Sequence, residues 1–106
     1  MGKRILVVDD EVVVLGAVTK ALKKTEYVID TAQSAEEALS LLAHGAYDVV
    51  VTDLMLPELS GRQLMERMRD MEVRAETILI TGYPSVQSAL RAKKLGAFDY
   101  VAKPFT

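Results

Sequence analysis

Five residues with chemically useful side chains follow strand-like apolar runs in this chain. They are three carboxylates, a hydroxyl and an ammonium group: Asp9, Asp10, Asp53, Thr81 and Lys103. Three carboxylates that converge on one point repel one another unless a cation joins them. Oxygen ligands without a nearby histidine or cysteine favour Mg²⁺, which keeps several waters and takes phosphate oxygens as further ligands. We therefore predict a magnesium site at the three aspartates, provided that the fold brings them together.

Phosphoryl transfer is the chemistry that this set of groups would support. The Thr81 hydroxyl and the Lys103 ammonium, placed beside a metal ion, would bind the oxygens of a phosphoryl group during its transfer. Asp53 would be the nucleophile and would form an aspartyl phosphate. Each residue alone has an ordinary alternative, since Asp10 could cap the following helix and the others could be loop or surface residues. Their common position after strands is what favours the chemical hypothesis.

The elements that must position these residues alternate between strands and helices. Apolar runs predict five strands, at residues 5–8, 27–29, 48–53, 77–80 and 98–101. Helices are predicted between them, and a fifth helix, usual after the last strand, is missing. Short connections and right-handed crossovers make this an α/β fold with a flavodoxin-like, doubly wound parallel sheet of strand order 2-1-3-4-5. In that order the first and third strands are neighbours, which would bring Asp9 and Asp10 beside Asp53.

The helix starts carry local signals. Ser34 and Glu37, and again Ser60 and Gln63, have the spacing of a capping box. The first helix is predicted from apolar periodicity alone, because its valines and Gly16 are poor helix formers. The fourth helix, opened by Pro84, has a thin apolar face and should be the least firmly held.

Two further features have ordinary structural explanations. His44, the only histidine, could relay a phosphoryl group, but it lies in the last turn of a predicted helix, where a cation complements the helix dipole. Met65, Met68 and Met71 are spaced to fill the core rather than to form a binding groove.

Composition limits the class of protein. The chain has 106 residues, 13 basic and 15 acidic, so its net charge of -2 gives no general attraction to nucleic acid or to an anionic membrane. It contains no cysteine, which excludes disulfides and thiolate chemistry. We find no signal peptide and no apolar run of membrane-spanning length. These features indicate one cytoplasmic domain, residues 1–106.

Four motifs in order are similar to those of the receiver domains of bacterial two-component response regulators. The motifs are Val7-Val8-Asp9-Asp10-Glu11, Asp53-Leu54-Met55-Leu56-Pro57 with Gly61, Thr81-Gly82-Tyr83 and Lys103-Pro104-Phe105. The resemblance covers residues 3–105 and is highly specific. It implies that Asp53 is the phosphoacceptor, that Asp9 or Asp10 holds Mg²⁺ together with Asp53, and that the Met55 carbonyl completes the protein ligands.

The resemblance also implies a switch. Thr81 and Lys103 would bind the phosphoryl oxygens, the Lys103-Pro104 bond would be cis, and Tyr100 matches the aromatic position that changes rotamer as Thr81 moves. Phosphorylation would then bias the surface made by the fourth helix and the fifth strand.

The implied partners are a sensor histidine kinase as phosphodonor and an effector domain or downstream protein, most simply a transcriptional regulator. A receiver module of a hybrid kinase or phosphorelay is the alternative output. We expect the chain to be the front part of a longer protein, and homodimerisation stays open because the missing helix belongs to the usual dimer face.

Two other classes of function compete with this one. An enzyme with an aspartyl-phosphate intermediate usually has an acid two residues after the nucleophile, but Met55 stands there. A nucleotide- or flavin-binding module would need a glycine-rich loop after the first strand, where this chain has Asp9-Asp10-Glu11. We therefore expect a signalling domain that catalyses only its own phosphorylation and dephosphorylation.

Overall fold

The computed structural model describes residues 3–23, 26–53, 56, 59–81 and 99–102. Its elements, in chain order, are β1 (Arg4–Val8), α1 (Val12–Leu22), β2 (Val28–Ala32), α2 (Ala35–His44), β3 (Val49–Asp53), α3 (Gly61–Asp70), β4 (Glu76–Thr81) and β5 (Asp99–Ala102). Among the described residues, none of the helices is long and apolar enough to cross a membrane.

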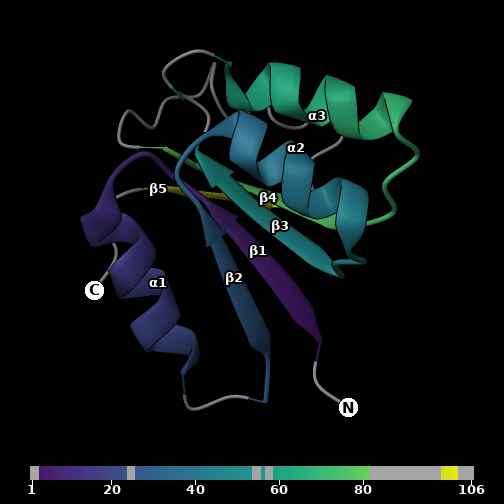
Figure 1. Cartoon of the computed structure of the whole chain (residues 1–106). Helices are drawn as coiled ribbons and strands as arrows, with labels where there is room; N and C mark the ends of the chain where they lie inside the picture. Colours follow the sequence, from purple (N-terminus) through teal and green to yellow (C-terminus); the bar gives the residue numbers. More distant parts are fainter. Residues whose placement is uncertain (1–2, 24–25, 54–55, 57–58, 82–98, 103–106) are drawn as a thin grey trace.

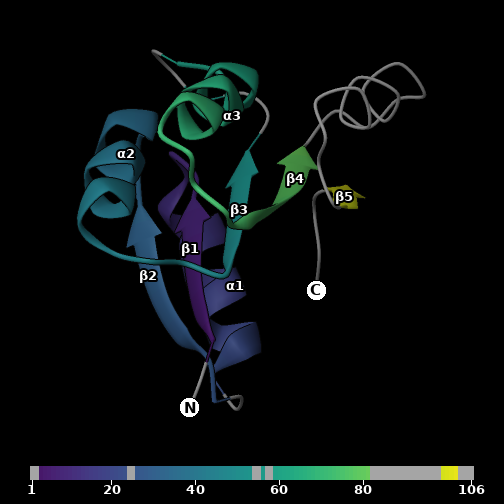
Figure 2. The ribbon, with the colours of Figure 1, turned by 90° about the vertical axis from the view of Figure 1, so that its right-hand side faces the viewer.

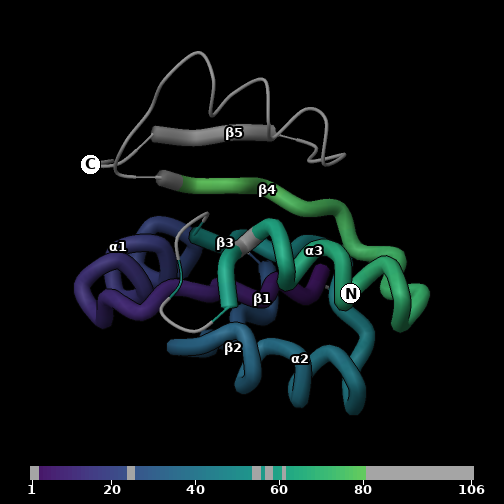
Figure 3. Tube along the Cα trace, turned by 90° about the horizontal axis from the view of Figure 1, so that it is seen from above, coloured from purple at the N-terminus to yellow at the C-terminus, as the bar shows by residue number. Residues whose placement is uncertain are grey.

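The five strands form one parallel sheet in the order β2-β1-β3-β4-β5. Viewed from above, β2, β1, β3 and β4 follow one another across the molecule (Figure 3). The predicted α/β fold and strand order are confirmed. In the register, Val8 pairs with Thr52, and Asp53 pairs with Ile80.

Helices cover both faces of the sheet, so its central strands are apolar on both sides. Helices α2 and α3 cover one face, and α1 covers the other (Figures 1 and 2). Leu6, Val8 and Val50 point into the larger core beneath α2 and α3. Ile5 and Val7, which alternate with them along β1, pack with α1 instead. This two-sided burial explains why β1 and β3 are uninterrupted apolar runs.

The two predicted helix starts are confirmed at α2 and α3. The Ser60 hydroxyl accepts the Gln63 N–H at 3.1 Å, and the Gln63 side chain accepts the Ser60 N–H at 3.0 Å, which completes a capping box. At α2, Ser34 likewise accepts the Glu37 N–H at 3.1 Å. The Glu37 carboxylate, however, accepts the N–H of Gln33, one residue before the cap.

Two sequence predictions need correction, and a third falls on residues that the structure does not describe. Strand β2 continues to Ala32, three residues beyond the predicted end at residue 29. Met65 and Met68 are buried as predicted, but Met71 is exposed because it caps the end of α3 rather than continuing its inner face. The predicted fourth helix lies outside the described residues.

Candidate functional site

Asp9 and Asp53 lie side by side at the carboxyl edge of the sheet. Strands β1 and β3 are parallel neighbours, and their register pairs Val8 with Thr52. The residue after Val8 is Asp9 and the residue after Thr52 is Asp53, so both aspartates lie at the same edge of the sheet. This is the position at which open α/β sheets bind their ligands.

Asp9 is held in place from two directions. It is fully buried, and its Oδ1 accepts the N–H of Glu11 at 2.8 Å, which turns the chain into α1. Its own N–H donates to the Ala32 carbonyl at the end of β2 at 3.0 Å. Asp10, between Asp9 and Glu11, is exposed. The pair therefore offers one fixed buried carboxylate and one carboxylate at the surface.

Asp53 is the last residue of β3 and is only 6% exposed. Its carbonyl accepts the hydroxyl of the fully buried Thr52 at 3.1 Å. Beyond it, Leu56 returns the chain to the core beneath α2 and α3. Buried residues on both sides of Asp53 thus fix the chain that carries its carboxylate.

The three aspartates form one carboxylate cluster, as the sequence predicts. One carboxylate oxygen from each of Asp9, Asp10 and Asp53 lies within 4.8 Å of the other two. Opposite ligands of an octahedral Mg²⁺ are about 4 Å apart, because each metal–oxygen bond is about 2 Å long. An all-oxygen set at this spacing fits Mg²⁺. The exposed side at Asp10 leaves room for waters and for phosphate oxygens.

The other predicted site residues are described only in part. Thr81 ends β4 directly after Ile80, which pairs with Asp53, so its backbone lies at the same edge of the sheet. Tyr100 belongs to β5, where its backbone pairs with Leu79. The positions of these two side chains, and of Met55 and Lys103 altogether, lie outside the described part of the chain.

His44 lies away from the carboxylate cluster. Helix α2 begins after β2 at the carboxyl edge of the sheet and ends at His44, toward the opposite edge (Figure 1). The imidazole Nδ1 lies 2.8 Å from the Ser40 carbonyl in the preceding turn. This placement favours the structural explanation of His44.

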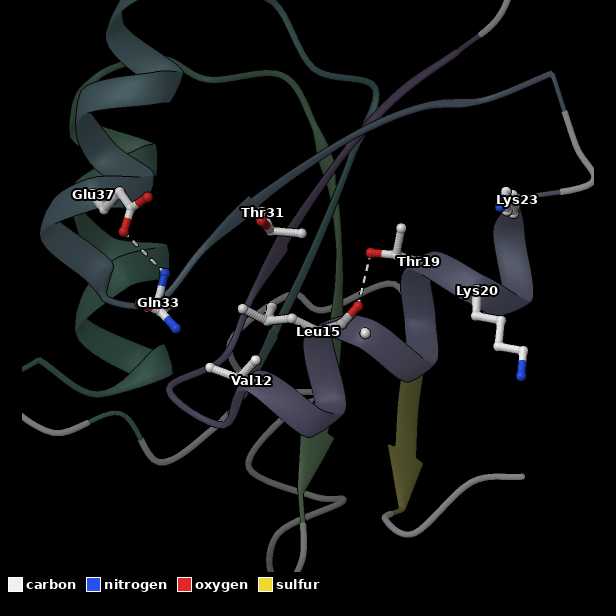
Figure 4. A pocket seen from close by; sticks show the side chains of 9 residues that line it. Val12, Leu15, Thr19, Lys20, Lys23, Thr31, Gln33 and Glu37 are labelled. Atoms are coloured by element: carbon white, nitrogen blue, oxygen red, sulfur yellow. Dashed lines mark hydrogen bonds between the residues drawn. The ribbon is translucent and has the colours of Figure 1, made fainter.

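An open groove of about 680 Å³ lies between α1 and the edge strand β2, and sequence reasoning missed it. Val12 and Gly16 on α1 face Thr31 and Gln33 across it (Figure 4). Val12, which lines it, is 64% exposed, and the adjoining Val13 is 82% exposed. The signal in the sequence is the composition of α1, whose eleven residues include one charged side chain, Lys20. A helix that is apolar on all sides is normally covered on all sides.

Comparison with known proteins places this chain in a family. A family model of the response regulator receiver domain matches residues 5–106. The chain is 40% identical over 102 residues to the regulatory protein AtoC of Escherichia coli, covering 96% of this chain and 22% of that protein. It is 35% identical over 99 residues to the transcriptional regulatory protein FixJ of Rhizobium meliloti, covering 93% and 48%. The chain thus spans less than half of either relative.

Solved structures agree with this assignment. The receiver domain of a Francisella response regulator superposes with a TM-score of 0.91 at 28% identity, covering 99% of this chain and 87% of that one. The response regulator TrrA of Thermotoga maritima, solved in complex with Mg²⁺-BeF, gives a TM-score of 0.84 at 38% identity, covering 98% and 89%. With a match that runs from Ile5 to the last residue, the chain belongs to the response regulator receiver domain family.

Proposed function

We infer that this domain takes a phosphoryl group from a phosphohistidine of a sensor histidine kinase onto Asp53, with Mg²⁺ as cofactor. The observation that carries this function is the carboxylate cluster, in which the buried Asp53 lies with Asp9 and Asp10 within 4.8 Å. Family membership supports it, because receiver domains are signalling domains and not classical enzymes. The solved Mg²⁺-BeF complex of TrrA supports the choice of metal.

The transfer is a substitution at phosphorus. A carboxylate oxygen of Asp53 forms the new P–O bond while the P–N bond to the donor imidazole breaks, and the imidazole leaves with the electron pair and takes up a proton. Bound Mg²⁺ would neutralise charge on the carboxylates and on the phosphoryl oxygens. Asp9, held by the Glu11 N–H, would supply a ligand that needs no reorientation. The Met55 carbonyl, Thr81 and Lys103 complete the proposed set.

The proposed output is a shift between two conformations of the receiver. The phosphoryl group would draw in Thr81, and Tyr100 would follow, altering the surface formed by the fourth helix and β5. A change from mostly inactive to mostly active needs about 5 kcal/mol of differential stabilisation. AtoC and FixJ are regulatory proteins of which this chain matches only part, which supports an effector domain that regulates transcription.

The proposed docking surface for the phosphodonor protein is the exposed start of α1. Val12 and Val13 follow directly after Asp10 and Glu11, so a protein that reaches Asp53 from this edge would cover them. Val13→Asp should slow transfer from the kinase at least tenfold but leave phosphorylation by acetyl phosphate unchanged. Val28→Asp, on a valine at the start of β2 that is 50% exposed, is the control. Equal rates of kinase transfer in both variants would exclude this surface.

The test of the phosphoacceptor function is intact mass after incubation with acetyl phosphate, with and without Mg²⁺. We expect one phosphoryl group on the wild-type chain only when Mg²⁺ is present, and none on Asp53→Asn. Asp70→Asn, at an exposed position at the end of α3, should behave as wild type. A phosphoryl group on folded Asp53→Asn would place the acceptor elsewhere. No phosphorylation of the folded wild type would reject the function.

A further inference from the structure

Thr52 carries a hydroxyl group in a fully buried position next to Asp53. It lies two residues after Val50, so the two side chains point to the same face of β3, the face packed beneath α2 and α3. Burying a hydroxyl costs free energy unless a hydrogen bond compensates for the lost water. Packing alone would therefore favour valine at this position, which is close to threonine in shape.

The hydroxyl donates to the carbonyl of the next residue, Asp53, at 3.1 Å. A bond between neighbours in the chain cannot tie one strand or helix to another. What it restrains is the peptide group that leaves Asp53, and with it the backbone at the Asp53 Cα. The effect of this hydrogen bond is therefore local to Asp53.

The orientation of that backbone decides how the carboxylate cluster fits together. Asp9 is fixed separately, by the N–H of Glu11 and by the carbonyl of Ala32. The direction of the Asp53 carboxylate toward Asp9 then depends in part on the backbone of Asp53 itself. Thr52, the buried Leu56 and the pairing of Asp53 with Ile80 of β4 together hold this backbone.

We propose that Thr52 is a positioning residue for the phosphorylation of Asp53. Its hydroxyl holds the Asp53 carbonyl so that the carboxylate faces Asp9 and Asp10 in the orientation that metal binding and phosphoryl transfer require. This role rests on the phosphoacceptor function proposed above and adds to it a residue that does not contact the phosphoryl group.

The experiment compares Thr52→Val, which removes only the hydroxyl, with Thr52→Ser, which keeps it. Three quantities are measured on the whole chain: the rate of phosphorylation by acetyl phosphate, the Mg²⁺ dissociation constant and the midpoint of thermal unfolding. In Thr52→Val we expect phosphorylation to slow and Mg²⁺ binding to weaken by about fivefold each, the size of one net hydrogen bond. The unfolding midpoint of Thr52→Val should stay at or above that of the wild type. In Thr52→Ser, the phosphorylation rate and the Mg²⁺ dissociation constant should each stay within about twofold of the wild-type values.

Thr77→Val is the matched control, because Thr77 is a buried threonine of the neighbouring strand β4 that pairs with Val50, away from Asp53. It should leave the rate and the Mg²⁺ affinity unchanged. A wild-type rate in Thr52→Val, an equal loss in Thr52→Ser, or an unfolded Thr52→Val chain would each overturn the role of Thr52. If the wild type takes no phosphoryl group, the phosphoacceptor function fails, and Mg²⁺ affinity alone decides whether Thr52 positions Asp53.

Discussion

The phenolic hydroxyl of Tyr47 donates a 2.6 Å hydrogen bond to Oδ2 of Asp30, joining the segment before β3 to the edge strand β2. The guanidinium of Arg4, at the start of β1, reaches the same oxygen at 3.3 Å and lies over the Tyr47 ring, 4.7 Å from its centroid. Three side chains from three segments thus form one contact, called here the Arg4–Asp30–Tyr47 cluster. The Arg4–Asp30–Tyr47 cluster holds the edge strand β2 against the rest of the sheet, whose strands β1 and β3 lead into the carboxylate cluster.

This cluster predicts a loss of stability at alkaline pH. Burial raises the pKa of Tyr47 above its usual value. The hydrogen bond to Asp30 and the negative charge of Asp30 raise this pKa further, whereas the positive charge of Arg4 lowers it. Because the pKa is higher in the folded state, the stabilisation is complete below the unfolded pKa of about 10 and is lost as the pH rises through the folded pKa. We expect the wild-type free energy of unfolding, measured in urea, to fall more steeply above about pH 10 than that of Tyr47→Phe.

At pH 7 the same substitution should cost about 1–2 kcal/mol, because the Asp30 carboxylate loses a donor. Parallel pH curves for the wild type and Tyr47→Phe above pH 10 would show that Tyr47 does not contribute to the alkaline loss.

Gly45 predicts a coupling to Arg4. A Cβ atom at position 45 would lie 3.2 Å from Nη1 and 3.3 Å from Nη2 of Arg4, so alanine requires the guanidinium that contacts Asp30 and Tyr47 to shift by a few tenths of an ångström. The backbone itself accepts alanine, since Gly45 has an extended φ of -147°. We expect Gly45→Ala to destabilise the wild type but to be neutral or stabilising in an Arg4→Ala background, where only the lowered conformational entropy of the unfolded chain remains. Urea unfolding of the four proteins should give a coupling energy of about 1 kcal/mol, and simple additivity would contradict this.

Glu72 predicts a stabilising substitution. Its φ of 59° lies in the left-handed region, and it follows the C-cap of α3 in a Schellman motif. In this motif the Glu72 N–H donates to the Arg69 carbonyl and the Val73 N–H donates to the Met68 carbonyl, both at 3.0 Å. Glycine adopts this conformation without the clash of a Cβ atom, so Glu72→Gly should raise the free energy of unfolding by about 1 kcal/mol. Glu66→Gly, the same substitution inside α3, should lower it by about as much. Changes of the same sign in both variants would refute the explanation.

The carboxylate cluster was predictable because few signals were needed to place it. Apolar runs mark β1 and β3, and the parallel order makes them neighbours, so Asp9, Asp10 and Asp53 must meet at one edge. The apolar character of these strands comes from burial on both faces, which makes it visible in one sequence.

The end of β2 was not predictable in the same way. Asp30 and Thr31 have the polar character of a turn, but they lie in an edge strand, where Thr31 is exposed. The Asp30 carboxylate is satisfied by Tyr47 and by Arg4, 17 and 26 residues away in the chain. Contacts of this range leave no local pattern, and neither does the burial of the Thr52 hydroxyl.

Magnesium should stabilise this domain through the carboxylate cluster. A ligand that binds only the folded state adds about 2.7 kcal/mol at a concentration one hundred times its dissociation constant. Thermal unfolding of the wild type should therefore shift upward with added Mg²⁺ and return when EDTA removes the metal. Asp10→Asn removes one of three mutually repelling carboxylates, so this variant should be more stable than the wild type without metal but respond less to Mg²⁺. Asp70→Asn, on the surface of α3, should follow the wild type in both conditions, and an equal Mg²⁺ response in all three proteins would show that the metal binds elsewhere.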